Sequence, residues 1–155
     1  MRLSLMSSAF ASGGAIPRRH TCEGENVSPP LRWSRLSEDV KSLTLIVDDP
    51  RAAAGGVFSH WVLYNIPPDM DGLPEGVEAG GTLPWGAMQG RNSFGNARYE
   101  GPCPPLDEEH TYYFRLYALD APLDISAGAT REQVLQHMEG HILDRSELMG
   151  RYGRG

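Results

Sequence analysis

Two stretches of the 155-residue chain carry the side chains best suited to binding an anion. Asp49 and His60 flank one loop, and a second histidine-containing stretch follows further along the chain. A carboxylate bonded to one imidazole nitrogen fixes the tautomer and raises the basicity of the ring, so the other nitrogen is left to donate to a phosphate or carboxylate oxygen. The pattern predicts that Asp49 orients His60 in a small anion-binding pocket. The alternative is that Asp49 only caps the Asp-Pro turn and that His60 is an ordinary core histidine.

The second stretch adds two hydrogen-bond donors and a rigid wall. His110 and Tyr112 lie two residues apart in a strand-like segment, so their side chains point the same way. The preceding segment, YEGPCPP at residues 99–105, contains a glycine that lets backbone approach a ligand and prolines that hold its shape. An ordinary rigid loop is the competing interpretation.

Three apolar segments predict the strands that position these residues. Residues 42–47 (SLTLIV) are uniformly apolar, which predicts a central strand that ends at the following Asp-Asp-Pro. Residues 60–66 (HWVLYNI) predict a second strand, closed by two prolines. Residues 110–119 (HTYYFRLYAL) alternate in side-chain type and predict a third. Asp49 and His60 are therefore expected at strand ends, where side chains can converge on a cavity.

Residues 130–149 predict the one helix of the chain. Thr130 is expected to cap it, Glu132 to lie in its first turn and Gly150 to end it. An interrupted apolar stripe follows one helical face: Val134, Leu135, Met138, Ile142 and Leu148. Residues 1–14 are expected to form the first strand. No apolar run reaches the roughly 20 residues needed to cross a bilayer, so no membrane span is expected.

Composition favours one β-rich domain over residues 1–155. The 18 glycines and 12 prolines suit many turns between short strands, and the length is typical of one domain. With 20 acidic and 14 basic residues the formal net charge is −6, which disfavours binding to a nucleic-acid backbone. An anion site must therefore be local. We expect a cytoplasmic protein.

The cysteines and the remaining histidines give no sign of catalysis or metal binding. Cys22 and Cys103 are too far apart for a CxxC motif, so they form either two free thiols, which a cytoplasmic location favours, or one long-range disulfide. Prolines on both sides of Cys103, and the lack of an oxyanion-hole signature, argue against a thiol nucleophile with His110 as its base. His137 and His141 lack a third ligand at sensible spacing. No enzyme activity, cofactor or metal is expected.

Four longer motifs extend almost from end to end of the chain. They read TCEGENVSPPLRW, DDPRA…GG…HWVLYNIP, GRNSFGNARYEGPCPP…HTYYFRLYALD and HILDRSELMGRY. Together they resemble the phosphatidylethanolamine-binding protein family, particularly its bacterial and archaeal branch of Raf kinase inhibitor-like proteins. The resemblance implies a mainly β fold of two packed antiparallel sheets with a C-terminal α-helix.

The resemblance also implies a function and a site. Family members carry a surface pocket that accepts phosphate-like anions, so the expected partner is a phosphate-containing small molecule or a phospholipid head group. Carried over residue by residue, the pocket consists of Asp49, His60, Gly101, Pro102, His110 and Tyr112. The two cysteines fall near the same end of the family fold, so a Cys22–Cys103 disulfide becomes as well supported as two thiols. Inhibition of a serine protease or a protein kinase through a surface loop is the alternative function, and a homodimer is a further expectation.

Two departures from the family pattern concern the rim of this pocket. Where the family often reads DPDAP, this chain reads DPRAA, so Arg51 either favours an anionic ligand or points into solvent. A Lys-Gly segment before the second histidine is replaced by LDEE at residues 106–109. These acids are expected to weaken an anion site and to raise the pKa of His110 where they lie close to it.

Overall fold

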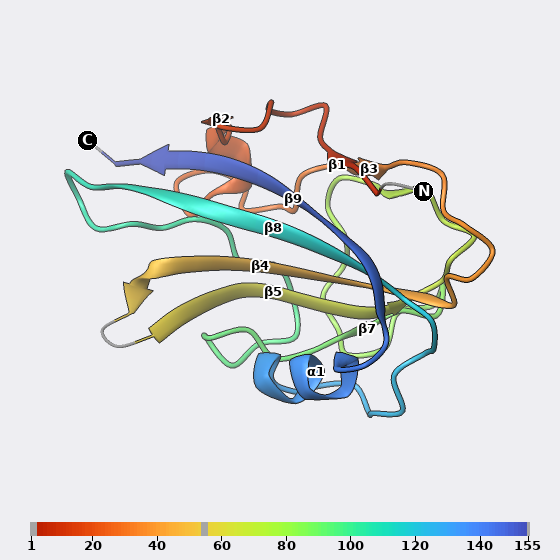
Figure 1. The fold of residues 1–155 in the computed structure, drawn as a ribbon. Helices are drawn as coiled ribbons and strands as arrows, with labels where there is room; N and C mark the ends of the chain where they lie inside the picture. The colour runs from red at the N-terminus through yellow and green to blue at the C-terminus, as the bar shows by residue number, and fades with distance from the viewer. Residues whose placement is uncertain (1–2, 54–55, 155) are drawn as a thin grey trace.

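The fold consists of two β-sheets packed face to face, seen in a computed structural model that describes residues 3–53 and 56–154 (Figure 1). The larger sheet has six strands in the order β2-β9-β8-β4-β5-β7, and the smaller has three in the order β1-β3-β6. Neighbouring strands are antiparallel except β2 and β9. The predicted mainly β fold of two packed sheets is therefore confirmed.

The strands differ greatly in length. Their bounds, with those of one 3₁₀ helix and one α-helix, are β1 (Leu5–Met6), β2 (Gly14–Ala15), the 3₁₀ helix (Arg18–His20), β3 (Leu31–Trp33), β4 (Ser42–Ala53), β5 (Gly56–Ile66), β6 (Gly72–Leu73), β7 (Met88–Gln89), β8 (Glu109–Leu119), α1 (Arg131–Met138) and β9 (Ile142–Gly153). The four long strands, β4, β5, β8 and β9, form the centre of the larger sheet. Among the residues described, no helix has the length and apolar character needed to cross a membrane.

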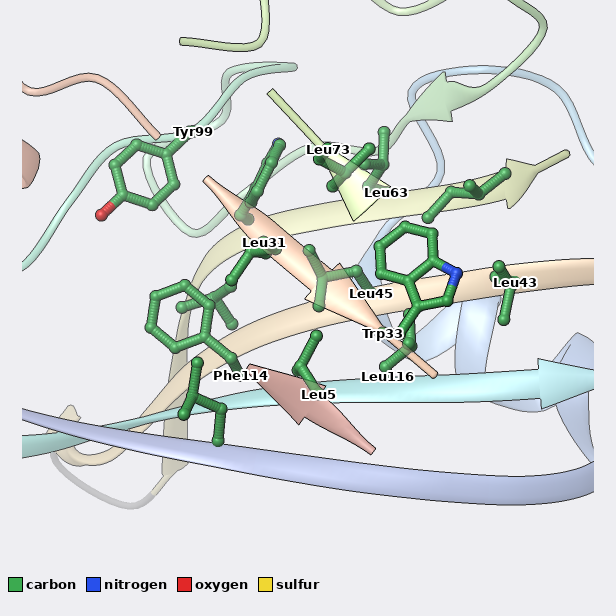
Figure 2. Close-up of a cluster of buried hydrophobic side chains, with 14 of the residues drawn as sticks. Leu5, Leu31, Trp33, Leu43, Leu45, Leu63, Leu73, Tyr99, Phe114 and Leu116 are labelled. Atoms are coloured by element: carbon green, nitrogen blue, oxygen red, sulfur yellow. The ribbon is translucent and has the colours of Figure 1, made fainter. Parts of the chain in front are cut away.

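The main core fills the space between the two sheets. Figure 2 shows Leu5 and Trp33 of the smaller sheet facing Leu45 and Phe114 of the larger one. These side chains are buried, and each contributes about 2 kcal/mol of transfer free energy. The alternating inward positions of β4 and β8 fix which residues of these strands face this layer.

A second, smaller core covers the opposite face of the larger sheet, where α1 packs. Ile46 of β4 and Tyr64 of β5 contact Val134 and Met138 of the helix in this layer. Asp48 is also buried on this face, where Arg131 Nε lies 3.1 Å from its Oδ2. Burial raises the pKa of Asp48, and the Arg131 guanidinium opposes that rise. Apolar packing and the ion pair between Arg131 and Asp48 therefore hold the helix against the sheet.

The predicted helix is correct at its start and wrong at its end. Thr130 caps α1 in a reciprocal capping box with Gln133, and Glu132 lies in the first turn, as expected. The helix stops at Met138, because Gly140 adopts a φ of +81° that favours glycine and turns the chain away. Residues beyond it form a strand instead.

Ile142, Leu148 and Gly150, which were expected in or just after the helix, belong to β9. Leu148 is buried opposite Phe114, whereas Ile142 is largely exposed. Gly150 ends no helix: it pairs with Tyr112, and a Cβ at this position would lie 2.5 Å from Ile16 Cγ1. The apolar residues of this segment therefore suit a strand that is buried on one side over part of its length.

Two predicted strand boundaries are also wrong. Strand β4 does not stop at Asp-Asp-Pro but continues to Ala53, and β5 begins at Gly56. Pro50 is tolerated because the β4–β5 register is irregular between Asp49 and Ala53, so no regular ladder bond is required there. The strand expected at residues 1–14 is reduced to Leu5–Met6, with Met1 and Arg2 outside the described residues. The central position of β4 and the strands at residues 60–66 and 110–119 are confirmed.

Candidate functional site

A cavity of about 500 Å³ opens among β4, β5, β8 and the loop that precedes β8. Its lining residues are Cys22, Asn26, Asp49, Phe58, His60, Phe94, Glu100, Gly101, Cys103, Pro104, Pro105, His110, Tyr112 and Arg154. Five of the six predicted pocket residues are among them. Pro102 is not: it is buried behind the wall, where its carbonyl accepts a hydrogen bond from the backbone of Cys22 at 3.1 Å.

Asp49 orients a histidine, but not the one expected. Its Oδ2 accepts a hydrogen bond from His110 Nδ1 at 2.6 Å, and both side chains are almost fully buried. The predicted pairing of Asp49 with His60 is therefore wrong. Strand β4 lies between β5 and β8, so its side chains reach histidines on either neighbour, and spacing along the chain does not reveal which one is closer.

The second nitrogen of His110 is also occupied. Glu108 Oε1 lies 2.9 Å from His110 Nε2, which places the imidazole between two carboxylates. The hydrogen bond to Glu108, together with Asp49, raises the pKa of His110 above its ordinary 6.5 against the opposing effect of desolvation. The expected rise in the pKa of His110 therefore comes from Glu108 of the acidic run. Glu109 turns away to Arg151, with 3.3 Å between Oε1 and Nη1.

His60 has a different environment from His110. Its Nδ1 lies 2.8 Å from the carbonyl oxygen of Glu100. The rings of Phe58, Tyr112 and Phe94 surround it at centroid distances of 5.0, 5.3 and 6.2 Å. Burial lowers the pKa of His60 below the ordinary 6.5, and the Glu100 carbonyl and the Asp49 carboxylate only partly offset this effect. The cavity therefore holds one histidine that favours its charged form and one that favours its neutral form.

Two further polar groups reach the cavity. Burial raises the pKa of Tyr112, so its hydroxyl stays protonated and able to donate. Asn26, at a left-handed φ of +61°, accepts a hydrogen bond from Gly101 N at 2.8 Å through Oδ1, which leaves its amide nitrogen as a donor. Gly101 must be glycine here, because a Cβ would lie 2.0 Å from the carbonyl oxygen of His20.

A disulfide and an arginine complete the wall. Cys22 and Cys103 are joined, with their Cα atoms 5.4 Å apart, so Cys103 offers no free thiol for nucleophilic attack. Arg154 donates to the carbonyl of Pro104 at 3.2 Å from Nη1. Arg51, in contrast, is exposed and is not among the lining residues; only its backbone reaches the site, donating to Asp49 Oδ1 at 2.9 Å.

The other paired histidines lie apart from this cavity. His137 Nδ1 bonds the carbonyl of Gln133 at 2.9 Å, and His141 Nδ1 bonds Asp120 Oδ1 at 2.8 Å. They therefore have separate partners rather than a common ligand.

Several lining residues were missed by sequence reasoning. They are Asn26, Phe58, Phe94 and Arg154. Asn26 and Arg154 lie far from the two chemical stretches, and no local pattern indicates that they reach them. One signal in the sequence was available, because Phe94 is an aromatic residue in a polar, glycine-containing loop, where an apolar side chain often marks a binding surface. In the structure Phe94 is 51% exposed and lines the cavity.

Comparison with known proteins agrees with this fold. The family model described as phosphatidylethanolamine-binding protein matches residues 6–153. A UPF0098 protein of Methanothermobacter thermautotrophicus is 52% identical over 153 residues, covering 99% of this chain and 100% of the relative. Among solved structures, the phosphatidylethanolamine-binding protein homologue CT736 of Chlamydia trachomatis superimposes with a TM-score of 0.90 at 41% identity, covering 99% of each chain. E. coli YbcL, described as a member of the mammalian family of these proteins, also has a TM-score of 0.90, at 31% identity and with both chains fully covered. The chain therefore belongs to the phosphatidylethanolamine-binding protein family.

Proposed function

We propose that this protein binds a small phosphate-containing anion in the cavity and acts as a binding module rather than as an enzyme. The observation that carries the proposal is the convergence of His60, His110 and Tyr112 on one cavity of about 500 Å³. A cavity of this size accommodates a head group and a few polar contacts. The name of the family refers to a phospholipid whose head group contains a phosphate, which supports the same class of ligand.

The charges around the cavity also support an anion. The carboxylates of Asp49 and Glu108 favour the charged form of His110, and the side chain of Arg154 lines the cavity. Glu108 places a carboxylate oxygen on His110 Nε2, so this nitrogen already has an oxyanion as its partner. A ligand oxygen that displaced Glu108 would form the same charge-assisted hydrogen bond.

Calorimetric titration with phosphoethanolamine tests the proposal. The His60→Ala variant should lose measurable binding, because it removes a wall of the cavity and a polar contact. The matched control is His137→Ala, which changes a histidine on α1 outside the cavity lining and should bind as the parent does. Equal binding by His60→Ala and the parent would rule out the cavity as the anion site. Mass spectrometry of the ligand after long incubation checks for turnover, which we do not expect.

Inhibition of a protease or kinase through a surface loop is the second candidate. It is favoured by two exposed apolar side chains, Phe94 at 51% exposure, which lines the cavity, and Leu106 at 67% exposure, which follows the lining residue Pro105 in the chain. Side chains of this kind mark protein contact sites when they gather together. If this function holds, Phe94→Ala with Leu106→Ala should relieve the inhibition of a panel of serine proteases and protein kinases, whereas His60→Ala should not. Loss of inhibition with His60→Ala alone would tie inhibition to the cavity instead.

A further inference from the structure

The Cys22–Cys103 disulfide lies at the surface of the protein, although it also lines the cavity. Both cysteines are exposed, in contrast to Gly101 and Pro102, which are buried beside Cys103. Neither cysteine belongs to a helix or a strand, because Cys22 lies in a turn after the 3₁₀ helix and Cys103 lies in the loop before β8. A dissolved thiol therefore reaches the bond without any opening of the two sheets.

The charges next to the two sulfurs differ. Arg154 Nη1 lies 3.9 Å from Cys103 Sγ. Cys22 is followed in the chain by Glu23, whose pKa is lowered by the hydrogen bond from Tyr152, so its carboxylate stays charged near neutral pH. A neighbouring guanidinium stabilises a thiolate, whereas a neighbouring carboxylate destabilises it. When the bond breaks, the negative charge is therefore better accommodated on Cys103 than on Cys22.

The backbone holds Arg154 beside Cys103. The N–H of Arg154 donates to the carbonyl of Glu108 at 3.2 Å, and its own carbonyl accepts from Asp107 N at 2.6 Å, so the residue is tied to the end of the loop that carries Cys103. Its Nε lies 3.5 Å from Glu23 Oε2, and its Nη1 is directed to the sulfur. The position of the guanidinium near Cys103 is therefore fixed from both its backbone and its side chain.

We propose that this disulfide is a thiol-exchange site, at which a small thiol becomes attached to Cys22 and Cys103 is released. The thiolate of the small molecule attacks Cys22 Sγ and forms a new S–S bond. The bond between the two cysteines breaks in the same step, and its electron pair leaves on Cys103 as a thiolate beside Arg154. One disulfide and one thiolate are consumed and one of each is formed, so the step requires no oxidant.

Cys103 is also the thiol that reverses the modification. Prolines on both sides restrict its backbone, and Cys22 N donates to the carbonyl of Pro102 at 3.1 Å, a contact that does not depend on the bond between the sulfurs. Attack of the Cys103 thiolate on Cys22 Sγ re-forms the original disulfide and releases the small thiol. Because both cysteines line the cavity, the attached group lies at the cavity wall while the modification lasts.

Reaction of the oxidised protein with glutathione tests the inference. Samples are taken at short times in native buffer, free thiols are capped with iodoacetamide, and tryptic peptides are analysed by mass spectrometry. Trypsin places the two cysteines in separate peptides, residues 20–32 and 99–115. Glutathione should be found on the first peptide and the capping group on the second, with a preference of roughly threefold to tenfold over the reverse arrangement.

A pair of arginine variants tests the role of the cation. Arg154→Gln removes the charge beside Cys103, so this variant should react more slowly and lose most of the preference for Cys22. The matched control is Arg151→Gln, which makes the same change of charge on β9, where the side chain contacts Gly13 and Glu109 rather than the disulfide. The control should keep the rate and the preference of the parent. If Arg154→Gln does not fold, the distribution in the parent protein still decides between the two cysteines.

Several results would overturn the inference. Absence of any adduct on the folded protein would show that the disulfide is inert to small thiols. Glutathione mainly on Cys103, or equally on both cysteines, would contradict the assigned leaving group, and an unchanged preference in Arg154→Gln would contradict the role of the arginine. A rate that rises with urea in proportion to the unfolded fraction would show that exchange takes place only in unfolded chains. The experiment contains no anionic ligand for the cavity, so its failure leaves the proposed function standing.

Discussion

Glu108 Oε1 lies 2.9 Å from His110 Nε2, so a carboxylate of the chain itself occupies the nitrogen that a bound anion would use. Glu108 is 53% exposed on its side chain, whereas His110 is almost fully buried. The contact therefore joins an exposed carboxylate to a buried imidazole. An anion that binds His110 Nε2 must therefore displace the carboxylate of Glu108.

Replacing Glu108 by glutamine should strengthen anion binding. The change removes a negative charge beside the site, and we expect the affinity for phosphoethanolamine to rise roughly threefold to tenfold. Glu109→Gln is the matched control, because Glu109 pairs with Arg151 instead. Calorimetry on the two variants checks this, and an equal gain in both would attribute the effect to net charge alone.

The same variant should change how stability depends on pH. The pKa of His110 is raised in the folded protein, so its contribution to stability is fully present below the ordinary value of 6.5 and is lost as the pH rises through the raised pKa. The parent should therefore exceed Glu108→Gln in unfolding free energy near pH 6, and the difference should shrink at alkaline pH. Urea unfolding across this range measures it. A constant difference at every pH would contradict the assignment to His110.

The two cavity histidines should titrate on opposite sides of 6.5, His110 above and His60 below. Nitrogen-15 NMR resolves both rings in one experiment. At pH 6.5 the ring of His110 should be more than half protonated and the ring of His60 less than half protonated. A common midpoint for the two residues would contradict the environments described above.

Reduction of the Cys22–Cys103 disulfide should destabilise the fold. The bond joins residues separated by 81 positions, and closing a loop of this size in the unfolded chain is worth about 4 kcal/mol in the chain-entropy model. Urea unfolding with and without a reductant measures the loss. The Cys22→Ser, Cys103→Ser double variant should match the reduced protein and should no longer respond to the reductant. An unchanged midpoint after verified reduction would show that the loop is already constrained by other contacts.

Gly101→Ala should disturb the wall of the cavity. Its Cβ would lie 2.0 Å from the carbonyl oxygen of His20 and 2.9 Å from Asn26 Oδ1, so backbone must move, at a cost of about 1–3 kcal/mol. Gly56→Ala is the control, because no heavy atom lies within 4 Å of the added Cβ. Thermal unfolding and phosphoethanolamine affinity should both fall for the first variant and remain near the parent values for the second.

The fold class and the central strands were predictable because their signals are local. The run at residues 42–47 is apolar on both faces of a strand that is indeed central, and the capping residue Thr130 begins the helix it was expected to begin. The helix end was mispredicted because the four-residue spacing of Ile142 from Met138 fits both a helical stripe and one face of a strand. Gly140 carried the decisive signal, since its positive φ ends the helix.

The sequence predicted most of the residues that line the cavity, but not which of them are hydrogen-bonded to each other. The motif resemblance brought Asp49, His60, His110 and Tyr112 to one cavity, where the structure also has them. It did not reveal that Asp49 bonds His110, because that choice depends on the order and register of three strands. Asn26 reaches the cavity through a turn and a backbone contact 75 positions along the chain, which no local pattern encodes.

Asp48 and Asp49 are adjacent in β4, yet they serve opposite faces of the sheet. Asp48 lies against Arg131 beneath α1, and Asp49 bonds His110 in the cavity. A slip of β4 by one residue would exchange the two faces. Each carboxylate would then be buried away from its own cation, an arrangement with a cost of several kcal/mol. The two contacts therefore favour the native register of β4, because the carboxylate that orients the site histidine would lose its partner in the shifted register.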